Sequence, residues 1–393
     1  MFFLGIGMLG VGLNLVGFLA FLFCLETPGK KGGLRRATSL QIPDLPGAYP
    51  GVSIVKTCCG VRDNEDQLFV HFFEQQYPGP LQLIFTVPEA SDPAVVLIKD
   101  FQVRYPHIDS VLVVSETRRA VYKKVDAIFD AQPYIQHPIT IISDSDTRVN
   151  AQYVSDMVAA LVPGQDFVST PQIDFGLNTF FSGLKWGNNA DCATLLNLAY
   201  LTKLDSLAFG HSMGFYTHVF QKCVDWDYLN QTLCDDQALP RLFVRQGYRV
   251  VWQRIKCPVS FANKTWATFL DQQRRHAQCQ KAPLGKTYLL SIVGYPFWPL
   301  FFYAVMAPSA VGVGLLIGYW AFRIFAAGYQ EKTILGTFRE TLRWGWVLPV
   351  WEFFKPALVI YTVFSNTVLY HGVPYTIENG FFLKRALLQK PLK

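Results

Sequence analysis

Short apolar runs alternate with stretches of helical spacing through the first half of the chain. Four runs predict buried strands, at residues 52–55, 81–87, 111–114 and 139–142. Between them, apolar residues recur at helical spacing over residues 67–75 and 93–104. Strands that alternate with helices predict an α/β domain with a mostly parallel sheet of the doubly wound type. Ligands of such sheets bind beyond the carboxyl ends of the strands, so we expect a site there.

Two other stretches, residues 1–25 and 287–322, carry no Asp, Glu, Lys or Arg. The first is long enough for one crossing of a bilayer core of about 30 Å, and the second is long enough for two. Pro308 lies near the middle of the second stretch and predicts a helical hairpin. No basic residue precedes the first apolar run, so we expect an uncleaved anchor rather than a signal peptide.

Basic residues around these stretches predict the orientation of the chain. A basic linker at residues 26–47 follows the anchor, and the positive-inside rule then places the next domain in the cytoplasm. Residues 323–343 are also basic, and we expect a cytoplasmic loop there. Residues 344–377 are apolar but contain Glu352 and Lys355, which indicates a segment that either lies on the membrane or spans it. A basic tail favours an inside C-terminus, whereas a crossing by this last segment would put it outside, so both topologies stay open.

Composition agrees with a soluble domain held between membrane segments. Hydrophobic residues make up 51% of the chain and charged residues only 16%, well below the roughly 25% of an ordinary soluble domain. These values exclude a disordered chain and argue against a wholly soluble enzyme. We expect an anchor at residues 1–25, a globular domain at 48–285 and a membrane region at 286–393. We attribute the net charge of +6 first to basic residues that orient the chain in the membrane and that attract anionic lipid. No run of Lys and Arg interleaved with aromatic residues indicates a nucleic-acid partner.

The eight cysteines are scattered and form no C-x-x-C pair. This pattern favours reduced thiols in a cytosolic domain over a disulfide framework, and it argues against a zinc site.

An Asp-x-Asp pair, Asp144 and Asp146, directly follows the fourth predicted strand. Two carboxylates at a strand end suit a hard divalent cation, Mg²⁺ or Mn²⁺, that is shared with a bound diphosphate. The alternative is an Asp-rich turn that caps a helix, which is at least as common.

Two other acidic positions begin predicted helices. Asp92 stands before Pro93, where a helix N-cap is the simplest interpretation. Asp235 and Asp236 precede a helical run at residues 238–245. A paired carboxylate can raise the pKa of one member and produce a general base, although a solvated helix start is the alternative.

Gln272 and Arg275 are three residues apart and lie on one face of a predicted helix. An arginine at such a position can clamp a diphosphate bidentately. The alternative is a polar cytoplasmic helix that precedes a membrane span, where basic residues are expected in any case.

These acids and the Gln-x-x-Arg motif occur in the order of a known family. The chain resembles the membrane-bound inverting glycosyltransferases with a GT-A fold and, among them, the ceramide glucosyltransferase family. The resemblance lies in residues 50–56, in Asp144-Ser145-x-x-Arg148-Val149, in Gly210-His211-Ser212-Met213, and in the position of Asp236 eleven residues before Gly247. It spans nearly the whole chain, although most positions between the motifs differ.

The resemblance implies a role for each matching residue. Asp92, Lys124, Asp144, Gln272 and Arg275 would bind the donor, Asp144 and Asp146 would hold the metal, and Gly210, Ser212 and His276 would lie on the acceptor side. Asp236 would be the base that takes a proton from the primary hydroxyl of the acceptor. The implied activity is transfer of a sugar, with glucose expected first, from a UDP-sugar to ceramide or a similar membrane lipid. The implied protein is a multi-pass membrane protein with its catalytic domain on the cytoplasmic side.

The chain also departs from the family pattern at three places. Arg275 is followed by His276 where the family has Trp, and the acidic pair is Asp-Asp where the family has Glu-Asp. The family has a Lys-x-Asn-Asn segment, and at this position the chain reads Lys124-Val125-Asp126-Ala127. These changes keep the metal and base positions but leave the donor sugar and the acceptor open. The alternatives are transfer to another lipid, such as a hopanoid or diacylglycerol, and a non-catalytic membrane protein that keeps the fold.

Overall fold

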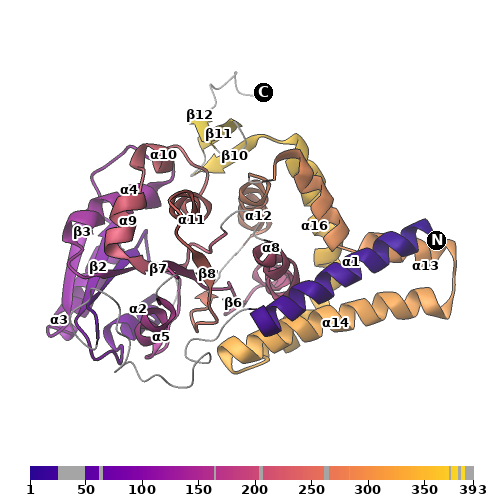
Figure 1. Cartoon of the computed structure of the whole chain (residues 1–393), viewed down its shortest axis with the longest axis horizontal. Helices are drawn as coiled ribbons and strands as arrows, with labels where there is room; N and C mark the ends of the chain where they lie inside the picture. Colours follow the sequence, from indigo (N-terminus) through magenta and orange to yellow (C-terminus); the bar gives the residue numbers. More distant parts are fainter. Residues whose placement is uncertain are drawn as a thin grey trace.

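The computed structural model describes most of the chain. The described residues are 1–24, 49–61, 65–162, 165–202, 207–260, 265–282, 284–370, 373–378 and 382–385, and the expected basic linker at 26–47 lies outside them. Figure 1 shows an α/β domain on the left, with long helices that extend from it to the right.

A seven-stranded sheet in the order β3-β2-β1-β4-β7-β5-β8 forms the centre of the α/β domain. Its strands are β1 (Val52–Thr57), β2 (Leu81–Val87), β3 (Asp109–Val114), β4 (Ile139–Asp144), β5 (Phe167–Ser169), β7 (Ser212–Tyr216) and β8 (Val250–Trp252). β1 to β4 pair in parallel, and β7 is antiparallel to both β4 and β5. The expected mostly parallel sheet is therefore confirmed. β6 (Asp174–Phe175) and β9 (Val259–Ser260) form a separate parallel pair.

Helices cover both faces of this sheet, which is why its central strands are almost continuously apolar. The covering helices are α2 (Glu65–Phe73), α3 (Ala94–Arg104), α4 (Lys123–Ala131), α5 (Tyr153–Ala160), α9 (Thr217–Cys223) and α11 (Asp235–Arg245). Phe73 of α2 stacks on Phe85 of β2 and on Phe101 of α3, so these elements share one aromatic core. The register pairs Thr57 with Asp144, so β1 and β4 end at the same edge.

Shorter helices connect the sheet to the membrane region. They are α6 (Phe180–Leu184), α7 (Trp186–Asp191), η4 (Cys192–Leu196) and α8 (Asn197–Leu201), together with the longer α12 (Trp266–Lys281). α10 (Trp226–Asn230) instead packs on α4 and α11 within the α/β domain. Gly17 of α1 lies so close to η4 that a Cβ at this position would clash with the carbonyl oxygen of Thr194. The α/β domain and the first helix are therefore in close contact.

Three helices among the described residues are long and apolar enough to cross a membrane: Phe2–Phe23, Ala310–Leu335 and Arg339–Phe364. The first contains α1 (Phe2–Leu19), the second is α14, and the third contains α15 (Arg339–Trp344) and α16 (Leu348–Phe364). A bent pair, η5 (Gly285–Gly294) and α13 (Phe297–Met306), meets at 52° and would make a fourth. α1 and α14 lie side by side (Figure 1), where Phe18 contacts Phe325 and Tyr329.

The membrane region differs from the expectation at residues 323–343. The predicted hairpin turns near Pro308, but its second arm does not end at residue 322. α14 continues to Leu335 and ends at Gly336, whose φ of 76° supplies a left-handed C-cap. The prediction of a basic loop was wrong over this part because Arg323 is fully buried and ion-paired, so its charge does not end an apolar helix.

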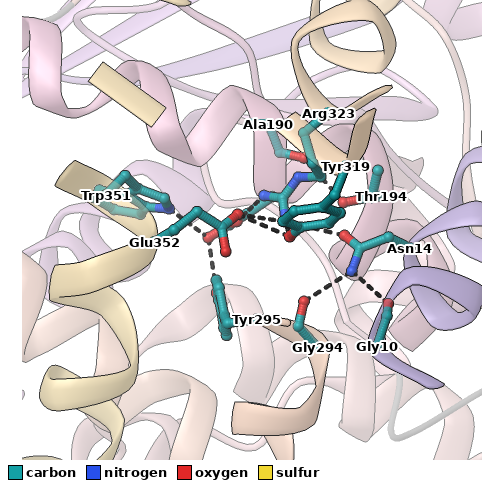
Figure 2. Close-up of polar contacts among 11 residues, drawn as sticks. Gly10, Asn14, Ala190, Thr194, Gly294, Tyr295, Tyr319, Arg323, Trp351 and Glu352 are labelled. Atoms are coloured by element: carbon teal, nitrogen blue, oxygen red, sulfur yellow. Dashed lines mark hydrogen bonds and ion pairs between the residues drawn. The ribbon is translucent and has the colours of Figure 1, made fainter. Parts of the chain in front are cut away.

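Arg323 belongs to a buried polar network that joins five parts of the chain (Figure 2). Its guanidinium lies 2.6 Å from Asp191 Oδ1 and 2.9 Å from Glu352 Oε1, and it donates to Asn14 Oδ1 at 3.0 Å. The Arg323 network comprises Asn14, Asp191, Tyr295, Tyr319, Arg323, Trp351 and Glu352. It ties α1, α7, α14, α16 and the end of η5 together at one point.

After α16 the chain returns to the α/β domain. The expected membrane segment at residues 344–377 is helical only to Phe364, and three antiparallel strands follow it. They are β10 (Thr367–Tyr370), β11 (Val373–Glu378) and β12 (Phe382–Arg385). Val368 and Ile377 pack against Leu233 and Cys234, directly before the acidic pair of α11.

Candidate functional site

Lys124 lies at the centre of a charged cluster at the carboxyl edge of the sheet. Its Nζ is 2.8 Å from Asp144 Oδ1, 3.0 Å from Asp235 Oδ2 and 2.8 Å from the carbonyl oxygen of Gly210. Burial alone would lower the pKa of Lys124, but the two carboxylates raise it well above its ordinary value. A permanently charged ammonium therefore holds together α4, the end of β4 and the start of α11.

Asp236 is the second acid of α11 and lies beside this cluster. Its Oδ1 is buried and has no hydrogen-bond partner among the described residues. Burial, followed by the charge of Asp235, raises the pKa of Asp236 to about 6, although Lys124 opposes the shift. A carboxylate with this pKa is ionised at neutral pH and is a stronger base than an exposed aspartate.

Gly210 brings the backbone close to both of these groups. A Cβ built on Gly210 would lie 3.2 Å from Asp236 Cβ and 3.2 Å from Lys124 Nζ. Glycine at this position therefore leaves the space that the base and the ammonium need.

The turn that follows β4 carries the Asp-x-Asp pair and is held from two sides. Lys56, at the end of β1, is buried and donates from Nζ to the carbonyl oxygen of Asp144 at 2.8 Å. Ser260 donates its backbone N–H to the carbonyl oxygen of Asp146 at 2.8 Å. The side chain of Asp144 keeps 31% exposure, so this carboxylate still reaches solvent beside the ammonium of Lys124.

The cluster has a donor set that a divalent cation accepts. Among the described residues, no three His, Cys, Asp or Glu side chains converge on one point. Mg²⁺ and Mn²⁺ take oxygen ligands and are commonly held by one or two carboxylates together with phosphate oxygens. Asp144 and Asp146 could supply these two carboxylates, and the phosphate oxygens of a donor would supply the other ligands.

Asp92 lies between two strand ends rather than in the Lys124 cluster. Its carboxylate accepts the backbone N–H of Gly60 at 2.9 Å and that of Ala94 at 2.8 Å. It thereby starts α3 and fixes the loop after β1, which is the helix-start role that the sequence offered as the simple interpretation.

α12 carries Gln272, Arg275 and His276, all partly buried. Burial, followed by the charge of Asp235, raises the pKa of the Tyr122 phenol. Lys124 and Arg275 both lie close enough to oppose this rise, and Asp144 adds to it. Arg275 is therefore near the Lys124 cluster. Burial, with Lys185, Arg275 and Lys355 nearby, lowers the pKa of His276 well below its ordinary value, so this imidazole is neutral.

Ser212 does not face the cluster. Its hydroxyl is fully buried and shares a hydrogen bond of 2.8 Å with the hydroxyl of Tyr153 on α5. The neighbouring His211 is also buried, bonds to Thr170 at 2.9 Å, and has a pKa that burial lowers to about 3. These two side chains stabilise the core under the site.

Sequence reasoning missed a second buried lysine, Lys185. Its Nζ lies 3.3 Å from Asp174 Oδ1, and both side chains are almost fully buried. Burial lowers the pKa of Lys185 to about 8, while Asp174 and Asp146 act against this shift. Lys56 and Lys185 each stand alone in apolar sequence, which is the one signal that could have indicated a buried role.

Comparison with known proteins supports the likeness seen in the motifs. The model of glycosyl transferase family 21 matches residues 14–382. Ceramide glucosyltransferase 1 of Caenorhabditis elegans is 25% identical over 126 residues, which are 32% of this chain and 27% of that protein. The ceramide glucosyltransferase of Candida albicans is 27% identical over 90 residues, which are 23% of this chain and 16% of that protein. The matched segments thus span less than two thirds of these relatives.

A solved structure extends the likeness to the fold. The mannosyltransferase PcManGT from Pyrobaculum calidifontis, in complex with GDP-Man and Mn²⁺, superposes with a TM-score of 0.51 at 15% sequence identity. The match covers 91% of this chain and 97% of that one. At this identity the comparison shows the fold alone, which is the expected GT-A fold.

Proposed function

This chain belongs to glycosyl transferase family 21, and we propose that it transfers glucose from UDP-glucose to the primary hydroxyl of ceramide or a similar membrane lipid. The family and the fold make it a glycosyltransferase that uses a nucleotide-sugar, and its apolar helices make it a membrane protein. The donor, the acceptor and the cytoplasmic placement of the α/β domain are the parts that we propose.

The observation that carries this proposal is the Asp236 carboxylate beside Lys124 and Asp144. In our proposal, Asp236 takes the proton from the acceptor hydroxyl, and the oxygen attacks the anomeric carbon from the side opposite the diphosphate. This displacement inverts the anomeric configuration. A positioned base of this kind contributes typically 10²–10⁴-fold to a rate.

Basic groups around the cluster are proposed to hold the departing diphosphate. Arg275, with Gln272 on the same face of α12, would bind phosphate oxygens, and Lys124 would remain charged near the donor. Asp92 would contribute to donor binding by holding the loop after β1 in place. Asp144 and Asp146 would hold Mg²⁺ or Mn²⁺, whose charge stabilises the negative diphosphate as it leaves. Gly210 and His276 are proposed to border the acceptor, with the neutral imidazole of His276 in place of an indole.

The test offers several acceptors in parallel to the full-length protein in lipid. Labelled UDP-glucose is added with ceramide, sterol, hopanoid or diacylglycerol, in Mg²⁺, Mn²⁺ or chelator. We expect labelled ceramide with a β-linked glucose and loss of product in chelator. Labelling of a different lipid would replace the proposed acceptor, and no labelled lipid with any UDP-sugar would leave the non-catalytic alternative.

An Asp236→Asn variant tests the proposed base directly. The amide keeps the shape of the carboxylate but cannot accept the proton, so turnover should fall by about 10²–10⁴-fold while UDP binding persists. Asp100→Asn is the matched control, because Asp100 lies exposed on α3 in an ion pair with Arg104. Loss of UDP binding in Asp236→Asn would show that this residue serves the donor instead.

A further inference from the structure

A basic pocket lies outside the candidate site, where α14 ends and α15 begins. Its volume is about 620 Å³, and its lining is Lys332, Gly336, Thr337, Phe338, Arg339, Leu342 and Arg343. Three of these residues are cationic and none is acidic. None of them belongs to the candidate catalytic site.

The acids of this turn face inward. Glu331 is buried and accepts the backbone N–H groups of Glu340 and Thr341 at 2.9 and 2.8 Å. Glu340 is also buried and accepts the N–H of Gly176 at 3.1 Å. These bonds fix the turn and keep both carboxylates away from the outer surface. The outer surface of the turn is therefore left with positive charge alone.

The cations of the basic pocket are exposed. Lys332 donates to the carbonyl oxygen of Gly336 at 2.9 Å, which satisfies the end of α14 but leaves the charge uncompensated. Arg339 and Arg343 are exposed and four residues apart on one face of α15. The ion pairs of the described residues involve neither of them. A ligand with negative charge would find three donors within one pocket.

The basic pocket also lies at the depth where a bilayer surface is expected. Exposed apolar side chains follow α14 from Val311 to Tyr329, and from Ala310 to Tyr329 the helix is about 30 Å long. Lys332 follows directly after this length. On the other side, Leu342 and Trp346 are 83% and 60% exposed, next to the cations. Apolar surface below and positive charge above match a phospholipid with an anionic head.

We propose that the basic pocket binds the phosphate head of an anionic phospholipid in the leaflet that faces the α/β domain. The head contacts Lys332, Arg339 and Arg343, and the acyl chains lie along Leu342 and the outer face of α14. This site is separate from any lipid that serves as acceptor, so it holds whether or not the proposed reaction is correct.

Native mass spectrometry of the full-length protein in detergent tests this proposal. Phosphatidylglycerol and phosphatidylcholine with identical chains are titrated separately, and the first bound lipid is quantified. We expect phosphatidylglycerol to bind at least about tenfold more tightly. Each cation near a membrane surface contributes about 1 kcal/mol, so each one removed should weaken the binding of phosphatidylglycerol roughly fivefold.

The decisive variant is Lys332→Gln/Arg339→Gln/Arg343→Gln, which should lose the preference for phosphatidylglycerol. Its matched control removes three exposed cations of the α/β domain, Lys99→Gln/Arg104→Gln/Lys222→Gln, and should bind as the native chain does. The thermal unfolding midpoint of each variant shows whether it folds. If the triple variant does not fold, Arg343→Gln alone should still weaken binding roughly fivefold.

Two results would overturn the proposal. One is an unchanged lipid preference in the folded triple variant or in Arg343→Gln. The other is displacement of phosphatidylglycerol by millimolar inorganic phosphate, because the basic pocket would then be a site for a free anion rather than for a lipid.

Discussion

Lys124 is the residue on which the charge of the candidate site depends. One ammonium faces the carboxylates of Asp144 and Asp235 directly and acts on Asp236 through space. Without it, three acids would lie close together in a poorly solvated place. The like charges would then raise the pKa of at least one of them further. Lys124 therefore opposes the rise in the pKa of Asp144 and of Asp236, and burial with the charge of Asp235 still raises the pKa of Asp236 to about 6.

The pH dependence of activity should follow the pKa of Asp236. The proposed base works only when ionised, so kcat/KM should fall as pH decreases below about 6, where Asp236 takes up a proton. The folded-state pKa lies above the ordinary value of 3.8, so the folded protein binds this proton more tightly than the unfolded chain. The stability contribution of Asp236 consequently decreases as pH rises between these two values. A rate profile without an acidic limb between pH 5 and 7 would contradict this assignment.

Gly210→Ala should lower activity about tenfold while the protein stays folded. The new Cβ would stand 3.2 Å from both Asp236 Cβ and Lys124 Nζ, so the base must shift by a few tenths of an ångström, and catalysis is sensitive to such displacements. Gly314→Ala is the control, because a Cβ there meets nothing within 4 Å. Equal activity of the two variants would mean that Gly210 does not set the position of the base.

The sequence could indicate the acids of this site but not all of its cations. Asp144 and Asp146 follow an apolar run, and Asp235 and Asp236 begin a helix, so both pairs were visible as strand-end and helix-start signals. Lys56 and Lys185 were not, because a buried lysine depends on partners that are distant in sequence, such as the carbonyl of Asp144 or the carboxylate of Asp174. Ser212, by contrast, was predicted to lie on the acceptor side because its neighbours match a family motif. Its hydroxyl faces the core instead.

At the level of elements, α12 and α16 act as one unit. α12 carries the Gln-x-x-Arg motif, and α16 packs along it from Phe354, which contacts Trp266 and Phe269, to its last turn. At that last turn, Lys281 of α12 donates to the carbonyl oxygens of Thr362, Val363 and Ser365 at 2.8, 3.2 and 2.9 Å. These are carbonyls that the helix end leaves without internal partners. One side chain therefore caps α16 and joins it to the motif helix.

Lys281→Met should loosen the end of α16. The capped carbonyls would lose their charged donor, which is worth on the order of 1 kcal/mol, so amide exchange over residues 358–366 should accelerate roughly five- to tenfold. Lys286→Met is the control, because that side chain is exposed. Unchanged exchange in Lys281→Met would show that packing alone holds α16 in place.

The elements that the sequence predicted correctly are those with local signals. The strands at residues 52–55, 81–87, 111–114 and 139–142 all appear, because each is a short continuous apolar run. Three of them are buried as expected, whereas β3 lies at the edge of the sheet and is only partly buried. The end of α14 could not be predicted in this way. Arg323 reads as the first residue of a loop, and only the fold reveals that Asp191 and Glu352 neutralise it.

At the scale of the whole molecule, the Arg323 network connects the α/β domain to the membrane helices. Asp191 closes α7, and its carboxylate accepts Tyr295 and Trp351 in addition to Arg323. Arg323 and Glu352 are both fully buried. A buried pair of this kind is not a strong source of stability, but removal of one partner leaves an uncompensated charge. The network thus penalises any arrangement in which α7 and α14 separate.

Arg323→Met should therefore destabilise the protein by about 3–5 kcal/mol, because Asp191 and Glu352 would be left buried with one cation fewer. Arg323→Met/Glu352→Met should recover much of this loss, since Asp191 keeps its two remaining donors and the new side chains are apolar. Thermal and denaturant unfolding in detergent measure both variants. A double variant that is less stable than Arg323→Met would contradict this account.

The three C-terminal strands also bear on how many times the chain is expected to cross the bilayer. Residues 339–385 begin and end in contact with the α/β domain, through Glu340 at one end and Val368 and Ile377 at the other. We therefore expect α16 to make no net passage, and the α13–α14 hairpin to go out and come back. Among the described residues, α1 would then make the one unpaired passage, and the N-terminus lies at its end away from the α/β domain (Figure 1). In a sealed vesicle, an epitope placed at Met1 and one placed beyond Arg385 would belong to different aqueous compartments.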